Sequence, residues 1–170
     1  MTREYLDQLL NGISLEAESE RSPLSLALLE IDQNNNVDDS FEDRLLRGVA
    51  DTVAGLLSDS QTAVRFSDHQ FMLLLSEEDP QHAIELTERM RQRIEATRYI
   101  ADGEALQTTI SCALAPMSAD QRGARWLESL QETLDEAKRY GGNRTFLYDG
   151  ISPAPVVPPE LNVGPLTCEI

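Results

Sequence analysis

The sequence predicts one α/β domain of the α+β type, with a mixed, mostly antiparallel sheet flanked by helices. Apolar residues recur at helical spacing in four stretches, and short strand-like runs lie between them. Two of these runs are separated by only a few polar residues, which is typical of a β-hairpin. A hairpin among strand–helix units disfavours a purely parallel, doubly wound sheet.

In the first part of the chain, residues 2–18 are predicted to form an amphipathic helix, because leucine and isoleucine recur at helical spacing. The run LSLALLEI, residues 24–31, is apolar on both faces and predicts a central strand that is covered on both sides. Residues 40–57 form a second predicted helix, with Ser40 as its N-cap.

The rest of the domain continues the alternation of elements. The predicted elements are strands at 62–66 and 70–76, a helix at 77–98, a strand at 107–115, a helix at 124–140 and a short strand within 143–150. Gly141 and Gly142 are expected to end the last helix. Residues 1–150 therefore make up the predicted folded domain.

Residues 151–170 differ in composition from the domain before them. The stretch SPAPVVPPELNVGPL holds five prolines and has too little periodicity to predict a packed element. We expect a proline-rich disordered tail, and favour a plain flexible tail over a proline-rich docking segment.

Composition and charge limit the classes of function. The chain has 170 residues, 41% of them hydrophobic, which suits one core rather than two domains. Its net charge of −16 disfavours binding to nucleic acid phosphates. Cys112 and Cys168 form neither a disulfide framework nor a zinc motif, so a cytoplasmic location is predicted. The opening MTREYLDQLL has no long apolar run, so direct membrane insertion is not expected.

Five segments resemble a known family: SPLSLALLEID, LLRGVADTVAGLL, VRFSDHQFMLLL, TTISCALA and LDEAKRYGGNR. They occur in the order and at nearly the spacing of the GGDEF family, the diguanylate cyclase domains of bacterial cyclic di-GMP signalling. The resemblance covers roughly residues 2–149. It implies a five-stranded sheet with surrounding helices, similar to nucleotide cyclase and polymerase palm domains, and this agrees with the predicted order of elements.

The resemblance also implies a two-metal chemistry. In active members, carboxylates hold divalent ions that neutralise the triphosphate of GTP while a 3′-hydroxyl attacks, and a dimer brings two GTP molecules together. The family's D-I-D stretch, which carries a metal ligand, corresponds to Glu30, Ile31 and Asp32. By strand alternation Glu30 and Asp32 share one face. We favour the interpretation that they are two solvated carboxylates at a strand end rather than magnesium ligands.

The hairpin corner departs furthest from the family. Where active members have glycine, glycine, an acidic residue, glutamate and phenylalanine, this chain has Ser67, Asp68, His69, Gln70 and Phe71. The side chains that replace the glycines obstruct a close approach of nucleotide to backbone. The metal-binding glutamate becomes a neutral amide, which is a much weaker ligand for a hard cation. Only the phenylalanine is retained, so no catalytic residue is expected here.

Other family positions are partly retained. In the triphosphate motif K-x-x-G-R-N, the lysine is Lys138, whereas Gly142 stands in the arginine position and Arg144 follows as a partial substitute. Asp43 matches an aspartate that recognises guanine. Asp43, Lys138 and Arg144 are therefore vestigial nucleotide-binding candidates, and Glu30 and Asp32 are vestigial metal-binding candidates.

These departures predict a pseudoenzyme: a catalytically inactive GGDEF-like signalling module that needs no cofactor. It would act by contact with a protein partner, or as a homodimer through its GGDEF-like face. An alternative is a GTP-sensing regulatory domain that binds GTP and Mg²⁺ through the vestigial residues. A residually active cyclase is a third hypothesis, and it requires Gln70 to serve as a metal ligand.

Overall fold

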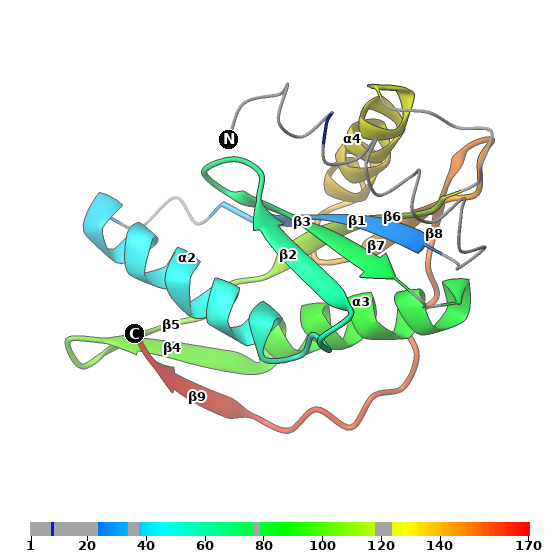
Figure 1. The fold of residues 1–170 in the computed structure, drawn as a ribbon. Helices are drawn as coiled ribbons and strands as arrows, with labels where there is room; N and C mark the ends of the chain where they lie inside the picture. The colour runs from blue at the N-terminus through cyan, green and yellow to red at the C-terminus, as the bar shows by residue number, and fades with distance from the viewer. Residues whose placement is uncertain (1–7, 9–23, 34–37, 77–78, 118–123) are drawn as a thin grey trace.

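The structure, a computed structural model, describes residues 8, 24–33, 38–76, 79–117 and 124–170, and two sheets lie among its helices (Figure 1). The helices of this part of the chain are α2 (Asp39–Ala54), α3 (Pro80–Ala96) and α4 (Ala124–Arg139). The strands of the larger sheet, in chain order, are β1 (Leu24–Ile31), β2 (Gln61–Arg65), β3 (Gln70–Ser76), β6 (Ile110–Pro116), β7 (Thr145–Tyr148) and β8 (Pro153–Pro155). Those of the smaller sheet are β4 (Thr97–Ala101), β5 (Glu104–Leu106) and β9 (Leu166–Glu169).

The larger sheet has the order β2-β3-β1-β6-β7-β8, and all of its pairs are antiparallel except β6 with β7. The smaller sheet has the order β5-β4-β9. The predicted mixed, mostly antiparallel sheet flanked by helices is therefore confirmed. The larger sheet has six strands rather than the five that the resemblance implied, because β8 adds to β7. The predicted helix at 2–18 falls almost wholly outside the described residues.

Strand β1 is the centre of the core, with the bounds predicted from its apolar pattern. Leu29 and its alternate neighbours pack in a cluster with α2 and α3, whereas Leu26 and Leu28 pack in a second cluster with α4. Both faces of the sheet are thus covered by helices (Figure 1). This arrangement fixes the carboxyl end of β1, where the candidate carboxylates lie.

Two helix boundaries correct the predictions. Helix α2 is capped by Asp38, whose carboxylate accepts a hydrogen bond from the Phe41 amide at 2.9 Å, so the predicted cap at Ser40 is wrong. Helix α3 ends at Ala96, and the last two residues of the predicted helix, Thr97 and Arg98, begin strand β4 instead. The side chain of Tyr99, on this strand, is fully buried.

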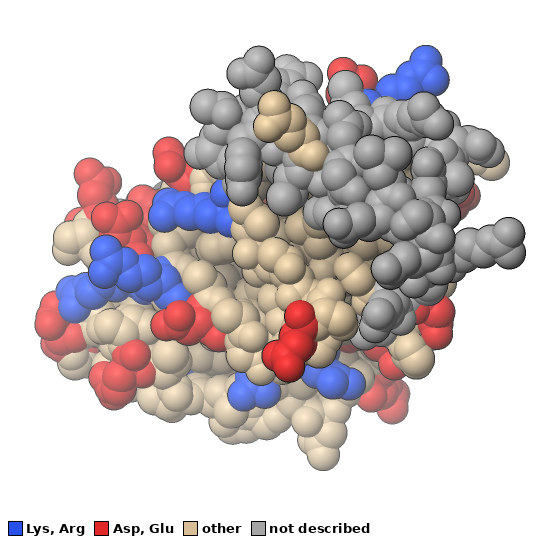
Figure 2. Space-filling view, in the orientation of Figure 1, with Lys and Arg blue, Asp and Glu red and all other residues tan. Residues whose placement is uncertain are grey.

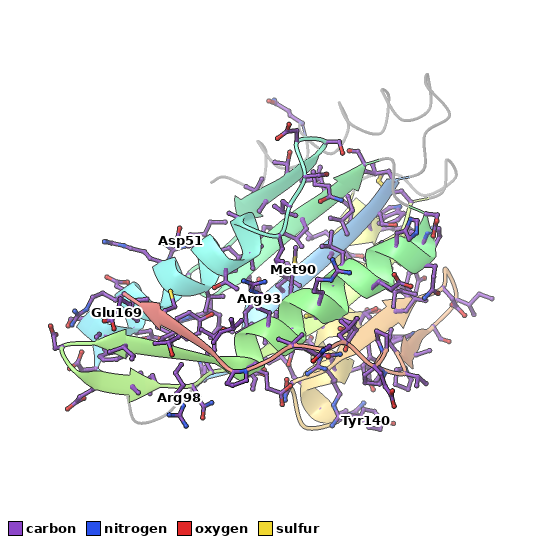
Figure 3. The ribbon with its side chains drawn as sticks, turned by 90° about the horizontal axis from the view of Figure 1, so that it is seen from below. Asp51, Met90, Arg93, Arg98, Tyr140 and Glu169 are labelled. Carbon is purple, nitrogen blue, oxygen red and sulfur yellow. The ribbon has the colours of Figure 1, made fainter. Side chains whose placement is uncertain are left out.

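The tail also differs from its prediction. Residues 151–170, which we call the strap, hold strands β8 and β9 instead of being disordered. Strand β8 pairs with β7, and β9 pairs in parallel with β4. The connection between β8 and β9 runs past α3, as Figures 1 and 3 show. Backbone groups at the edges of β7 and β4 are available for pairing, and prolines are tolerated on edge strands. The domain boundary at residue 150 stays a prediction.

The strap ends against α2 at Gly48, where the missing side chain leaves a notch in the helix surface. A Cβ atom at Gly48 would lie 2.6 Å from Cγ2 of Ile170 and 2.9 Å from Cδ1 of Tyr99, closer than packed carbons approach. Cys168 and Ile170 both pack against the core cluster of α2 and α3. Gly48 is therefore required by the close approach of the strap.

No helix of the described part of the chain is long and apolar enough to cross a membrane.

We predict that Gly48→Ala destabilises the protein by about 1–3 kcal/mol, the usual cost of overpacking a core. At an ordinary helix position the same change is stabilising, by about 1 kcal/mol. Thermal or urea unfolding of the purified variant measures the difference. Combining the change with Ile170→Ala is expected to recover part of the loss. A more stable Gly48→Ala variant would show that Ile170 does not occupy the notch.

Candidate functional site

The candidate site lies where the carboxyl end of β1 meets the β2–β3 corner, the last turn of α4 and the loop after it. Glu30 of β1 is directly opposite Gln70 of β3 in the antiparallel register. Lys138, in the last turn of α4, reaches the same carboxylate. The fold therefore brings together Glu30, Gln70 and Lys138, although Lys138 lies 108 residues after Glu30 in the sequence.

The Glu30 carboxylate has a protein donor on each oxygen. Its Oε2 accepts a hydrogen bond from Nε2 of Gln70 at 2.5 Å, and its Oε1 is ion-paired with Nζ of Lys138. The Glu30 side chain is only 13% exposed, so water can solvate little of it. The ammonium of Lys138 supplies the positive charge that balances this carboxylate, and the amide of Gln70 acts as a donor. Neither behaves as a metal ligand in this arrangement.

Asp32 is held by three donors. Oγ1 of Thr109 and Oγ of Ser111 each donate to it at 2.6 Å, and the Asn143 amide donates at 3.0 Å. Gly142 has a φ of +70°, and a Cβ at this position would lie 3.1 Å from Oδ1 of Asp32. Asp32 thus anchors the loop that follows α4 to β1 and β6. The favoured interpretation of two solvated carboxylates is wrong for Asp32 and Glu30, since both are partly buried and have protein partners.

The β2–β3 corner is supported from within the chain. Arg65 donates from Nε to the carbonyl of Ser67 at 3.2 Å and from Nη2 to the carbonyl of Asp68 at 3.1 Å. Ser67 and Asp68 are both exposed. Among the described non-glycine residues, a positive φ occurs at Asp102 and Asn143, so the corner has a backbone that ordinary residues adopt. The corner therefore forms the turn of the hairpin without the positive φ angles that favour glycine.

A small hollow lies beside the corner. Its volume is about 20 Å³, room for a water molecule but far below the roughly 300 Å³ of the smallest typical ligand pockets. Its lining includes Asp32, Glu42 and His69, and Nδ1 of His69 lies 3.4 Å from Oε1 of Glu42. In this structure the hollow does not have the size of a nucleobase site.

The remaining candidates lie outside this group of contacts. Asp43 is exposed on α2, and the neighbouring Glu42 lines the hollow in its place. Arg144 is exposed and its Nε donates to the carbonyl of Gly142 at 3.0 Å, so its side chain folds back on its own loop. Glu42, Thr109 and Ser111 were not among the residues predicted from the sequence. The alternation of hydroxyl residues in TTIS, at the start of a buried strand, is the signal for the last two.

A buried ion pair supports the loop from behind. Arg91 donates to both oxygens of Glu88, at 2.9 and 3.0 Å, and to Oδ1 of Asn143 at 2.8 Å. Thr145 donates to Glu88 at 2.6 Å. Burial alone raises the pKa of Glu88, but the donors outweigh burial and hold that pKa below its ordinary value. The loop between α4 and β7 is therefore tied to α3 as well as to β1.

The partners of Glu30 and Asp32 decide whether these carboxylates are placed to bind divalent cations. A two-metal site needs several carboxylate oxygens that face a common point. Here Glu30 faces an amide donor and an ammonium group, and Asp32 faces two hydroxyl groups and a backbone amide. Among the described residues, no three His, Cys, Asp or Glu side chains form a group suited to a metal ion. The donor set does not fit a two-metal centre.

Comparisons with known proteins agree with the fold and the order of elements. The profile described as "Diguanylate cyclase, GGDEF domain" matches residues 1–144. Diguanylate cyclase A of Treponema denticola is 26% identical over 132 residues, which cover 75% of this chain and 36% of the relative. The chain thus spans about a third of the length of this relative.

Two solved structures show the same fold. The GGDEF domain of DgcB from Caulobacter crescentus, in complex with c-di-GMP, has a TM-score of 0.78 and 22% identity, and the match covers 85% of this chain and 89% of that one. The diguanylate cyclase SiaD from Pseudomonas aeruginosa, in complex with its activator SiaC, has a TM-score of 0.77 and 23% identity, with 86% and 58% covered. At these identities the likeness is one of fold.

We predict that Gln70→Glu lowers the free energy of unfolding by about 1–3 kcal/mol, because a donor to Glu30 becomes a second carboxylate in a poorly solvated site. Mg²⁺ or Mn²⁺ should recover part of this loss, whereas the unsubstituted protein should not respond. Thermal unfolding with and without each ion is the measurement. Gln131→Glu is the matched control, since Gln131 also donates to a carboxylate but is on the exposed face of α4. Equal metal responses in both variants would contradict the assignment.

Proposed function

The chain belongs to the GGDEF family of diguanylate cyclase domains, and on that premise we propose that it is a non-catalytic member that acts through protein contact. Membership relates the chain to cyclic di-GMP signalling. The observation that carries the proposal is the occupation of the Glu30 carboxylate by Lys138 and Gln70.

The proposal follows from how phosphoryl transfer is accelerated. Metal ions neutralise the charge that develops on the transferring phosphate, and losing such stabilisation commonly costs about 10²–10³ in rate. In an active corner, a glutamate opposite the β1 carboxylate leaves two negative charges that a cation must balance. In this chain the amide of Gln70 and the ammonium of Lys138 balance the remaining carboxylate without a metal ion.

The corner and the loop after α4 support the same proposal. Asp68 adds a negative charge, 96% exposed, at a corner where a polyanion would have to approach. Gly142 stands where the triphosphate motif has its arginine, and it lies against Asp32. Arg144 is directed to its own loop. Three separate parts of the site therefore disfavour GTP turnover.

A second groove, between α2 and β2, offers a surface for contact with a protein partner. It has a volume of about 300 Å³ and lies between α2 and β2. Apolar side chains line most of it, among them Leu46, Val53 and Phe71, and charged groups stand at its rim. Figure 2 shows basic side chains among acidic ones over α2, at the left of the view. Because SiaD is in complex with its activator, a protein partner for this fold has a precedent.

We predict that the protein makes no cyclic di-GMP from GTP with Mg²⁺ or Mn²⁺ at any protein concentration. Chromatography of the reaction, with diguanylate cyclase A of Treponema denticola as positive control, measures the product. The triple variant Ser67→Gly, Asp68→Gly, Gln70→Glu is expected to stay inactive, because Gly142 still replaces the arginine. Product from the unsubstituted protein would refute the proposal. Product from the triple variant alone would show that the corner residues by themselves account for the loss of cyclase activity.

The GTP-sensing alternative rests on Lys138, which the chain retains from the triphosphate motif and which is 43% exposed. We predict no binding, because Lys138 is already paired with Glu30 and the hollow beside the corner is too small for a base. Titration calorimetry with GTP, with and without Mg²⁺, measures this. A saturable heat of GTP binding that disappears in Lys138→Ala would show that the protein is a GTP-sensing domain and does not act by protein contact alone.

A further inference from the structure

The strap contains a proline segment, residues 153–160 (PAPVVPPE), whose own sequence holds the backbone extended. Four of its eight residues are prolines, and each proline fixes its own φ at about −65°. A residue that precedes a proline is restricted to the β and polyproline II regions, and this applies to Ala154, Val157 and Pro158. The sequence of the segment therefore favours a polyproline II backbone, which has three residues per turn.

The exposure of the side chains follows the same period of three. Pro153, Val156 and Pro159 are half-buried and lie three residues apart. The residues between and after them are exposed: Ala154, Pro155, Val157, Pro158 and Glu160. One face of the segment therefore packs on the domain, while the other two faces are turned to solvent.

Each turn of the segment is anchored on its inward face. Pro153 begins β8, which pairs with β7. The amide of Val156 donates to the carbonyl of Thr145 at 3.0 Å. The carbonyl of Pro159 accepts a hydrogen bond from Gln92 of α3 at 3.2 Å, where the strap passes α3 (Figure 1). The segment is therefore fixed in its extended form, with its outward faces already presented.

The outward faces carry two dipeptides that each join an apolar residue to a proline. These are Ala154-Pro155 and Val157-Pro158, and the inward residue Val156 separates them. Among the described residues, Val157 is the most exposed large apolar side chain, at 88%. Pro155 and Pro158 are one polyproline II turn apart and so share a face. Grooves lined by aromatic side chains, as in SH3, WW and EVH1 domains, bind proline-rich segments of this PxxP form.

We propose that the proline segment docks in an aromatic-lined groove of a partner protein, with Pro155, Val157 and Pro158 in the groove. The proposal rests on the proposed role as a protein-contact module and names the class of partner. Because the segment is already extended and anchored, binding has little backbone left to order. The domain thus serves as the scaffold that presents the segment.

Charge defines the rim of the partner's groove. Residues 149–170 include Asp149, Glu160 and Glu169 but no lysine, arginine or histidine, and the whole chain carries a net charge of −16. Like charges placed opposite each other across an interface cost affinity, whereas opposite charges favour association. The groove that fits this segment therefore has a basic rim.

The test measures binding of the full-length protein to an array of purified SH3, WW and EVH1 domains whose groove rims range from acidic to basic. We expect saturable binding to domains with a basic rim, and each domain's own proline-rich peptide should displace the protein. The absence of binding to every domain of the array would overturn the proposal.

Variants of the segment show whether it is the contact. The double variant Pro155→Ala, Pro158→Ala and the single variant Val157→Glu are each expected to weaken binding about tenfold, the effect of losing one well-buried apolar contact. Their thermal unfolding should stay close to that of the unsubstituted protein, because the three side chains are exposed. Pro165→Ala is the matched control, an exposed proline of the strap outside the segment. Equal losses in the control and the double variant would overturn the assignment.

A synthetic peptide of residues 151–164 tests whether the docked segment is accessible. Binding of the peptide but not of the protein would show that the domain hides the segment, and would also overturn the proposal. The cyclase assay does not depend on the strap. Cyclic di-GMP product would refute the contact role itself, whereas a failure to bind the array would refute only the assignment of the proline segment.

Discussion

The pairing of the Glu30 carboxylate with Lys138 and Gln70 is the interaction on which the site depends. A carboxylate that is mostly buried at a strand end needs a positive charge or several donors. In this chain the last turn of α4 and the first residue of β3 supply them, so both oxygens of the Glu30 carboxylate have a partner within the protein. The same contacts join β1, β3 and α4, so the arrangement serves the fold as well.

A second set of contacts extends from this point through the molecule. Asp32 fixes the backbone at Asn143, and Arg91 holds the Asn143 side chain while it pairs with the buried Glu88. Thr145 links Glu88 to β7, and its carbonyl accepts the strap's Val156 amide. The loop after α4 is therefore placed by α3 and β7 as well as by β1.

The local parts of the fold were predictable, and the long-range pairings were not. Periodicity gave β1 its bounds because its apolar residues cover both faces. It did not separate β4 from α3, since a short strand that follows a helix directly has no turn residue to mark it. Residues 166–169 form strand β9 because they pair with the edge of β4, which lies far from them in the sequence. Likewise Glu30 and Lys138 were each candidates by family motif, but their pairing depends on tertiary structure.

We infer that the charge of the Glu30 carboxylate is neutralised by Lys138 and not by a metal cation. The most direct measurement is carbon NMR of the side-chain carboxyl groups in protein labelled at glutamate, titrated with paramagnetic Mn²⁺ with and without GTP. We expect the Glu30 signal to broaden no faster than those of exposed glutamates on the helices. Selective broadening of the Glu30 signal at low Mn²⁺ would show that the ion displaces Lys138 and binds there, and would contradict this inference.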